Sequence, residues 1–205
     1  MPRALYYTRR WGQLFAGLFL FGFAAAMMLR SGFGVDPWTV FAEGIHVTWG
    51  FSIGWVIVVT GALVLLIWIP LRQRPGLGTI LNVLLIGPAM EIGLVLIETP
   101  ASLVQRGFLF ATGLLMMGIA SGLYIGARFG PGPRDGLMVG FNARFGWPMW
   151  AVRTVVEVTA LVIGWVLGGS FGVGTVIFAL SIGTLAQRSI MVFRVPDYPM
   201  KSTGK

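Results

Sequence analysis

Six apolar segments, each about 20 residues long, dominate this 205-residue chain. A helix needs about 20 mainly apolar residues to cross the hydrocarbon core of a bilayer. Hydrophobic residues make up 56% of the chain and charged residues only 11%, so a soluble fold would lack the polar residues to cover its surface. We therefore predict an all-α membrane protein with six transmembrane helices, at approximately Trp11–Leu29, Phe51–Leu71, Gly76–Ile97, Gly107–Ala127, Trp147–Leu167 and Gly172–Ile190.

The basic residues between these segments are distributed unequally over the two sides. With the N-terminus in the cytoplasm, twelve Lys and Arg residues fall inside and only Arg30 and Arg106 fall outside, with Arg153 within the fifth segment. Cytoplasmic loops carry such an excess of positive charge. We therefore predict a multi-pass protein of the bacterial cytoplasmic (inner) membrane with both termini in the cytoplasm, and we interpret the net charge of +8 as a topology signal.

Several function classes lack support in the sequence. The chain has no cysteine and one histidine, so it offers no thiolate site, no disulfide and no cluster of metal ligands. Phosphate-binding GxxxxGK[ST], nucleophile-elbow and HExxH motifs are absent, and so is an aromatic and basic stripe for nucleic acid. We predict no cofactor, no metal and no nucleic-acid partner; the expected partners are the lipid bilayer and an unidentified small solute, and a homo-oligomer stays open.

The two halves of the chain align without a gap at an offset of 96 residues. Gly34 then meets Gly130, Pro37 meets Pro133, and the run ends with GLGT at 76–79 against GVGT at 172–175. Each half holds three predicted spans, an odd number, so the second half must enter the membrane from the opposite side. This predicts one membrane domain, 1–205, as a 3+3 inverted-topology repeat, with repeat one at about 11–97, repeat two at about 107–190 and a cytoplasmic tail at 191–205.

A segment of about twenty residues separates the first and second spans of each repeat, too long for a tight turn. Each has a Gly- and Pro-rich break and then about a dozen moderately apolar residues from Pro37 or Pro133. Proline suits the first turn of a helix, so we expect one short helix per repeat, either re-entrant or interfacial. Interrupted segments at matching positions of an inverted repeat point to a transporter's central site; an interfacial helix pair without a ligand is the alternative.

Three blocks of this sequence resemble the bacterial YczE/YyaS/YitT membrane proteins, in the YczE-like branch. They are Pro37-Trp38-Thr39-Val40, the block IPLRQRPGLGTILNVLLIG at 69–87, and GPRDGLM at 132–138. The resemblance covers nearly the whole chain and implies a membrane protein with a transport role. The family pattern Pro-Trp-Asp-Val has Thr39 in place of its acid here, while the offset pairs Thr39 with Asp135 and an acid stands instead at Asp36. This departure argues against a mechanism that needs two symmetric carboxylates.

Ionisable residues inside spans are costly and usually face a cavity or each other. Arg153 and Glu157 are four residues apart, a spacing that places them on one helix face, where they form either a structural ion pair or a gate. Glu91 has no basic partner in its own helix and is either a proton-coupling carboxylate or an exposed interfacial group.

The remaining candidates lie at the start of the two short helices: Asp36, Trp38, Thr39, Arg134 and Asp135. Acids there either cap a helix N-terminus or, with Arg134, help to hold a ligand. A tryptophan here is an interfacial belt residue or a ligand contact.

The leading functional hypothesis is a small-solute transporter or permease with a central site between the two Pro-initiated helices. The alternative is a non-transporting membrane subunit that assists assembly of a biosynthetic or envelope complex. An intramembrane enzyme that uses Glu91 or Asp135 has less support, since the sequence shows no pattern that pairs a nucleophile with a general base.

Overall fold

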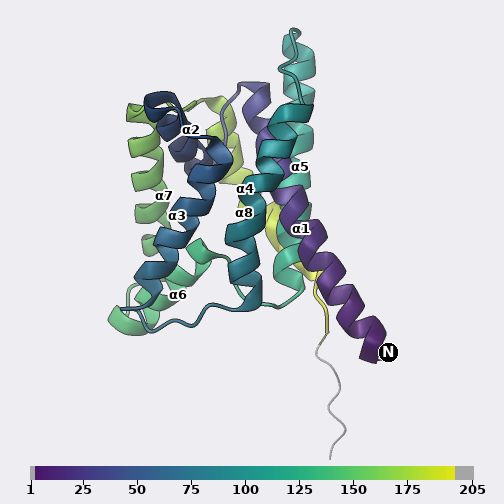
Figure 1. Ribbon diagram of the computed structural model, residues 1–205, viewed down its shortest axis with the longest axis vertical. Coiled ribbons are helices and arrows are strands. Elements are labelled where there is room, and N and C mark those ends of the chain that lie inside the picture. The colour runs from purple at the N-terminus through teal and green to yellow at the C-terminus, as the bar shows by residue number, and fades with distance from the viewer. Residues whose placement is uncertain (1–2, 197–205) are drawn as a thin grey trace, which may run out of the picture.

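The computed structural model describes residues 3–196. Within that range the chain forms eight α-helices and no β-strand (Figure 1), with the bounds α1 Arg3–Ser31, α2 Pro37–Trp49, α3 Ile53–Trp68, α4 Leu77–Leu96, α5 Leu103–Gly126, α6 Pro133–Phe145, α7 Met149–Val166 and α8 Val173–Phe193. Five helices, α1, α4, α5, α7 and α8, are long and apolar enough to cross a bilayer. α2 and α3 pass that test only as a pair, which bends by 119° at the break between them.

The predicted all-α membrane fold is confirmed, with differences at the ends of several elements; α1 begins at Arg3 and α5 at Leu103, both earlier than predicted. α3 ends at Trp68 after 16 residues, a length of about 24 Å, because Pro70 has no N–H group to continue the helical hydrogen bonds. It is therefore shorter than the predicted second span. α8 continues to Phe193, three residues into the predicted tail, and residues 197–205 of that tail lie outside the described residues.

The two short helices begin at the predicted prolines, since α2 starts at Pro37 and α6 at Pro133. Each has 13 residues, about 20 Å of helix. Each ends at a glycine in the left-handed conformation, Gly50 with φ 77° and Gly146 with φ 70°, which L side chains rarely adopt. The short helices are confirmed, and their depth in the bilayer stays a prediction.

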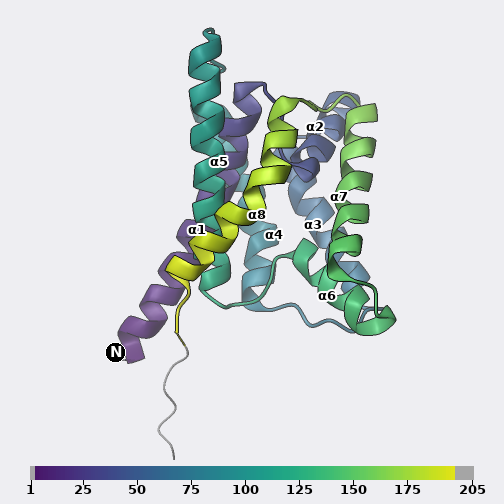
Figure 2. The same cartoon turned by 180° about the vertical axis from the view of Figure 1, so that it is seen from behind.

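The helices pack as two groups (Figure 1 and Figure 2). α1, α4, α5 and α8 form one group, and α2, α3, α6 and α7 form the other. α3 packs along α4 and joins the groups on one side. On the other side α7 and α8 share a short connection at one end, diverge away from it and make few contacts. The groups are therefore closed together at α3 and α4 and separated at α7 and α8.

Glycines allow the close approach of α3 and α4. A Cβ atom on Gly54 would overlap the carbonyl oxygen of Gly87, and a Cβ atom on Gly87 would overlap that of Gly54. Small residues permit such backbone contact between membrane helices. At an offset of 96 the second half has Trp150 and Gly183, and nothing lies within 4 Å of a Cβ atom built on Gly183.

Several backbone contacts recur at the offset of 96 residues. The N–H of Gly78 donates to the carbonyl of Phe129 at 2.9 Å, and the N–H of Gly174 donates to the carbonyl of Phe33 at 2.8 Å. These bonds tie the first turns of α4 and α8 to the breaks that precede α6 and α2. They give the GLGT and GVGT sequences a structural role, because each positions the start of the short helix in the other half.

Two arginines make a further pair of contacts at the same offset. Arg10 Nε donates to the carbonyl of Ala127 at 2.8 Å, and Arg106 Nε donates to the carbonyl of Ser31 at 2.6 Å. Their guanidinium groups lie over the rings of Phe129 and Phe33, at 4.2 and 5.8 Å from the centroids. Each arginine thereby satisfies a carbonyl at the C-terminal end of α5 or α1, where no intrahelical donor is available.

Candidate functional site

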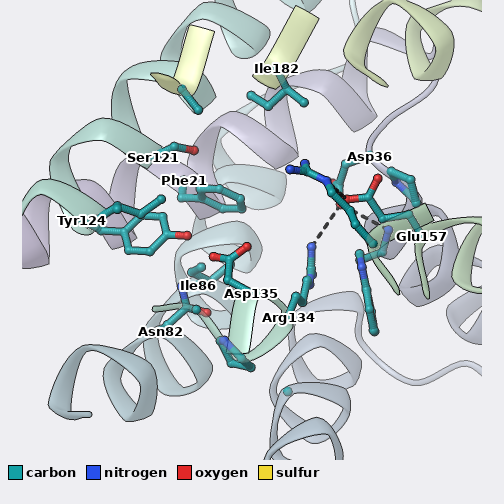
Figure 3. Close-up of a pocket in the computed structure, with 18 of the residues that line it drawn as sticks. Phe21, Asp36, Asn82, Ile86, Ser121, Tyr124, Arg134, Asp135, Glu157 and Ile182 are labelled. Carbon is teal, nitrogen blue, oxygen red and sulfur yellow. Dashed lines mark hydrogen bonds and ion pairs between the residues drawn. The ribbon is translucent and has the colours of Figure 1, made fainter. Parts of the chain in front are cut away.

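A cavity of about 420 Å³ lies between the two helix groups and reaches the gap between α7 and α8 (Figure 3). Its polar end is formed by the first turns of α2 and α6 and by one face of α7. Its other walls are largely apolar and include Phe21, Ile86, Phe178 and Ile182. The volume is within the range of about 300–1,000 Å³ that is usual for small-molecule sites.

Six of the eight predicted candidates line this cavity: Asp36, Trp38, Arg134, Asp135, Arg153 and Glu157. They come from the start of α2, the start of α6 and the first half of α7, which are far apart in the sequence. The other two, Thr39 and Glu91, are not among its lining residues.

Asp36 caps α2 from the position before Pro37. Its Oδ1 accepts from the backbone N–H groups of Trp38 and Thr39 at 3.2 and 3.3 Å, and its Oδ2 accepts from the Thr39 hydroxyl. Asp36 is 4% exposed. Thr39, where the resemblance led us to expect an acid, thus provides a hydroxyl that donates to the acid at position 36.

Arg134 connects the two short helices. Its Nη1 lies 3.4 Å from Asp36 Oδ1, and its guanidinium group lies 4.6 Å from the centroid of the Trp38 ring. The positive charge of α6 therefore meets the carboxylate that caps α2, and the N-terminal ends of the two short helices are held together across the cavity (Figure 3). The charge of Arg134 is therefore paired with that of Asp36.

Asp135 lies in the first turn of α6 among neutral polar groups. A Cβ atom built on Gly132 would lie 3.3 Å from Asp135 Oδ2, 3.4 Å from the Tyr124 hydroxyl and 3.7 Å from Asn82 Nδ2, so these atoms gather around one point. Figure 3 shows the Tyr124 hydroxyl directed at the Asp135 carboxylate. Among the described residues no basic side chain lies within 4 Å of Asp135, which leaves this carboxylate facing the cavity without an ion pair.

Arg153 and Glu157 form the intrahelical ion pair that their spacing predicts, with Arg153 Nε 3.0 Å from Glu157 Oε1. Their side chains are 49% and 33% exposed. The pair stands on α7 at the gap toward α8, so both groups can be reached from inside the cavity.

Glu91 lies outside the cavity and contacts the start of α3. Its Oε1 accepts from the backbone N–H of Gly54 at 2.6 Å. Because the first N–H groups of a helix have no intrahelical acceptor, Glu91 supplies one from α4 at the point where α3 and α4 touch. This geometry favours a capping role over the proton-coupling role considered above.

Three site residues were not anticipated. Tyr124 and Asn82 are polar groups within spans, and that polarity was the signal available. Trp68 donates from Nε1 to the carbonyl of Pro133 at 3.0 Å and is 2% exposed, so it fixes the start of α6 from the end of α3. No sequence pattern connects Trp68 with Pro133, because the contact spans 65 residues.

The fold and the cavity define a class: this is a helical integral membrane protein with a charged cavity between two packed groups of helices. Residues 8–190 match a family described as "Family of unknown function (DUF6198)", and the chain belongs to this family. Together with the relatives described next, this match confirms the predicted relationship to YczE-like proteins.

Three relatives support this membership. An "Uncharacterized protein" of Haemophilus influenzae is 38% identical over 187 residues, which cover 91% of this chain and 85% of the relative. The "Uncharacterized membrane protein YczE" of Bacillus subtilis is 29% identical over 183 residues, covering 88% and 85%. The "Uncharacterized protein YyaS" of the same organism is 22% identical over 165 residues, covering 78% and 82%. No solved structure matches the chain.

Proposed function

We propose that this protein is a small-solute transporter of the bacterial inner membrane and that its substrate binds in the cavity between the two helix groups. The observation that carries the proposal is the unequal packing around the cavity, closed where α3 meets α4 and separated between α7 and α8. In an alternating-access mechanism each state has its central cavity open on one side and closed on the other.

The offset of 96 residues supports this mechanism. α2, α3 and α4 begin at Pro37, Ile53 and Leu77, and α6, α7 and α8 begin 96 residues later in each case. In an inverted-repeat transporter the two halves exchange conformations to expose the site to the other side. The second state would therefore bring α7 and α8 together and separate α3 from α4.

The side of the opening follows from the proposed topology. The gap between α7 and α8 widens toward the end of the molecule where α1 begins and α8 ends (Figure 2). The excess of basic residues assigns that end to the cytoplasm. The structure is therefore interpreted as the state open to the cytoplasmic side.

Alternating access is tested with single cysteines, because the chain has none of its own. Ile182 lines the cavity and is 9% exposed. An Ile182→Cys variant in sealed vesicles of either orientation is treated with a membrane-impermeant thiol reagent. Glu98→Cys and Ala143→Cys, at exposed positions toward opposite ends of the molecule, serve as one-sided controls.

A transporter is expected to label at position 182 in both orientations, while each control labels in only one. Labelling at 182 from a single side would contradict alternating access. A stable stoichiometric partner recovered by crosslinking, together with that one-sided result, would instead support the assembly subunit.

A further inference from the structure

The gap between α7 and α8 is bordered by two helices that are each long and apolar enough to cross a bilayer. An opening between two such helices faces the lipid along part of its length, in addition to the water at its wide end. A ligand that resides in the membrane can therefore enter the cavity sideways.

The α8 border of this gap is mainly apolar, with Gln187 as its polar side chain. Phe178, Ile182, Ala186, Ile190 and Met191 line the cavity from α8, and Met191 is 68% exposed. Burying such a wall against hydrocarbon is favourable, whereas the wall offers few hydrogen-bond partners to a fully hydrated solute.

The opposite end of the cavity presents both signs of charge. Asp135 is a carboxylate with no ion-pair partner among the described residues, and Arg153 has a half-exposed guanidinium group. A carboxylate selects an ammonium group, and an arginine fork matches a phosphate. The remaining charges are all paired: Glu157 with Arg153 Nε at 3.0 Å, and Asp36 with Arg134. The Arg153 side chain is 49% exposed, so its other N–H groups can donate to a ligand.

We propose that the ligand of this cavity is an amphiphile with a zwitterionic, phosphate- and amine-bearing headgroup, which enters from the bilayer between α7 and α8. The amine contacts Asp135, the phosphate contacts Arg153, and the hydrocarbon chain lies along α8. This inference rests on the proposed transport function and names its substrate class.

Native mass spectrometry of the purified full chain tests the proposal with three probes. Palmitoyl lysophosphatidylethanolamine carries the tail and both charges, palmitoyl lysophosphatidic acid lacks the amine, and phosphoethanolamine lacks the tail. We expect the first to bind, the second to bind about tenfold more weakly, as expected for the loss of one charge-assisted hydrogen bond, and the third not to bind.

Two variants with matched controls locate the bound probe. Gly183 lines the cavity at the gap, and Gly12 lies in α1 outside it; a Cβ atom on either has nothing within 4 Å. Gly183→Trp should lower lysophosphatidylethanolamine binding at least tenfold, and Gly12→Trp should not change it. Arg153→Gln should lower binding about tenfold, whereas Arg188→Gln, outside the cavity on α8, should leave it unchanged.

Equal binding of phosphoethanolamine and the lysolipid would overturn the proposal, and so would undiminished lysolipid binding by both Gly183→Trp and Arg153→Gln. Either outcome leaves the labelling of position 182 from both sides unaffected. The substrate class and the transport mechanism can therefore fail separately.

Discussion

Gly61 of α3 lies directly against Val83 of α4, since a Cβ atom built on Gly61 would be 3.6 Å from the Cβ atom of Val83. At an offset of 96 the corresponding residues are Glu157 of α7 and Ala179 of α8. α7 and α8 make few contacts, and the cavity lies between them. The same pair of positions is therefore in contact in one half of the chain and separated in the other.

A double variant Gly61→Cys/Val83→Cys should form a disulfide rapidly under mild oxidation, because Cβ atoms in disulfides are about 3.5–4.5 Å apart. The variant Glu157→Cys/Ala179→Cys should oxidise much more slowly, in proportion to how seldom the gap closes. The loss of free thiols, followed by alkylation and mass spectrometry, measures both rates. Equal rates for the two pairs would show that α7 and α8 are not separated.

The ion pair between Asp36 and Arg134 should contribute measurably to stability. Asp36→Asn keeps a good N-cap residue on α2, so it removes mainly the charge. In a double-mutant cycle with Arg134→Gln we expect a coupling free energy of about 1–2 kcal/mol. This is below the roughly 3–5 kcal/mol lost on breaking a fully buried pair, because the Arg134 side chain is 33% exposed and solvent screens its charge. Unfolding in mixed micelles provides the four stabilities, and additive effects would count against the pair.

Gly136→Ala should destabilise the protein although alanine favours helices. A Cβ atom on Gly136 would overlap the six-membered ring of Trp68, and overpacking of this kind costs about 1–3 kcal/mol. Gly12→Ala, in a helix with free space around it, should instead be neutral or stabilise by up to about 1 kcal/mol. Apparent melting temperatures compare the two, and a Gly136→Ala protein as stable as the Gly12→Ala protein would show that Trp68 does not fix α6.

Glu91→Gln should leave both the fold and the two-sided labelling of position 182 intact, because the amide oxygen can still accept from Gly54. Glu91→Leu removes the acceptor and leaves a backbone N–H unsatisfied, which costs about 1–3 kcal/mol. Thermal unfolding and the labelling assay separate these effects. If Glu91→Gln abolished labelling from one side, Glu91 would be a coupling group and not only a cap.

Hydropathy was sufficient to predict the helical membrane fold, and the prolines were sufficient to predict the starts of α2 and α6, because both signals are local. The end of α3 was placed too late because an apolar run continues past Trp68 to Leu71. In that run the helix stops because Pro70 cannot donate a backbone hydrogen bond, whatever the hydrophobicity of its neighbours.

The cavity was predicted in part. The charges at Asp36, Arg134, Asp135, Arg153 and Glu157 were visible as costly groups in or near apolar segments, and the structure gathers them around one cavity. Which of them pair was not predictable beyond the helical spacing of Arg153 and Glu157, since the contact of Asp36 with Arg134 crosses 98 residues. Tyr124 and Trp68 were missed for the same reason.

The short α3 also determines how this protein meets its bilayer. α3 and α7, with 16 and 18 residues, extend about 24 and 27 Å, whereas α1 and α5, with 29 and 24 residues, extend about 43 and 36 Å. The hydrocarbon layer, roughly 30 Å thick, must thin at one flank and meet tilted or protruding helices at the other. This hydrophobic mismatch brings headgroups closest to the flank that borders the gap between α7 and α8, and it should make the protein prefer thin membranes.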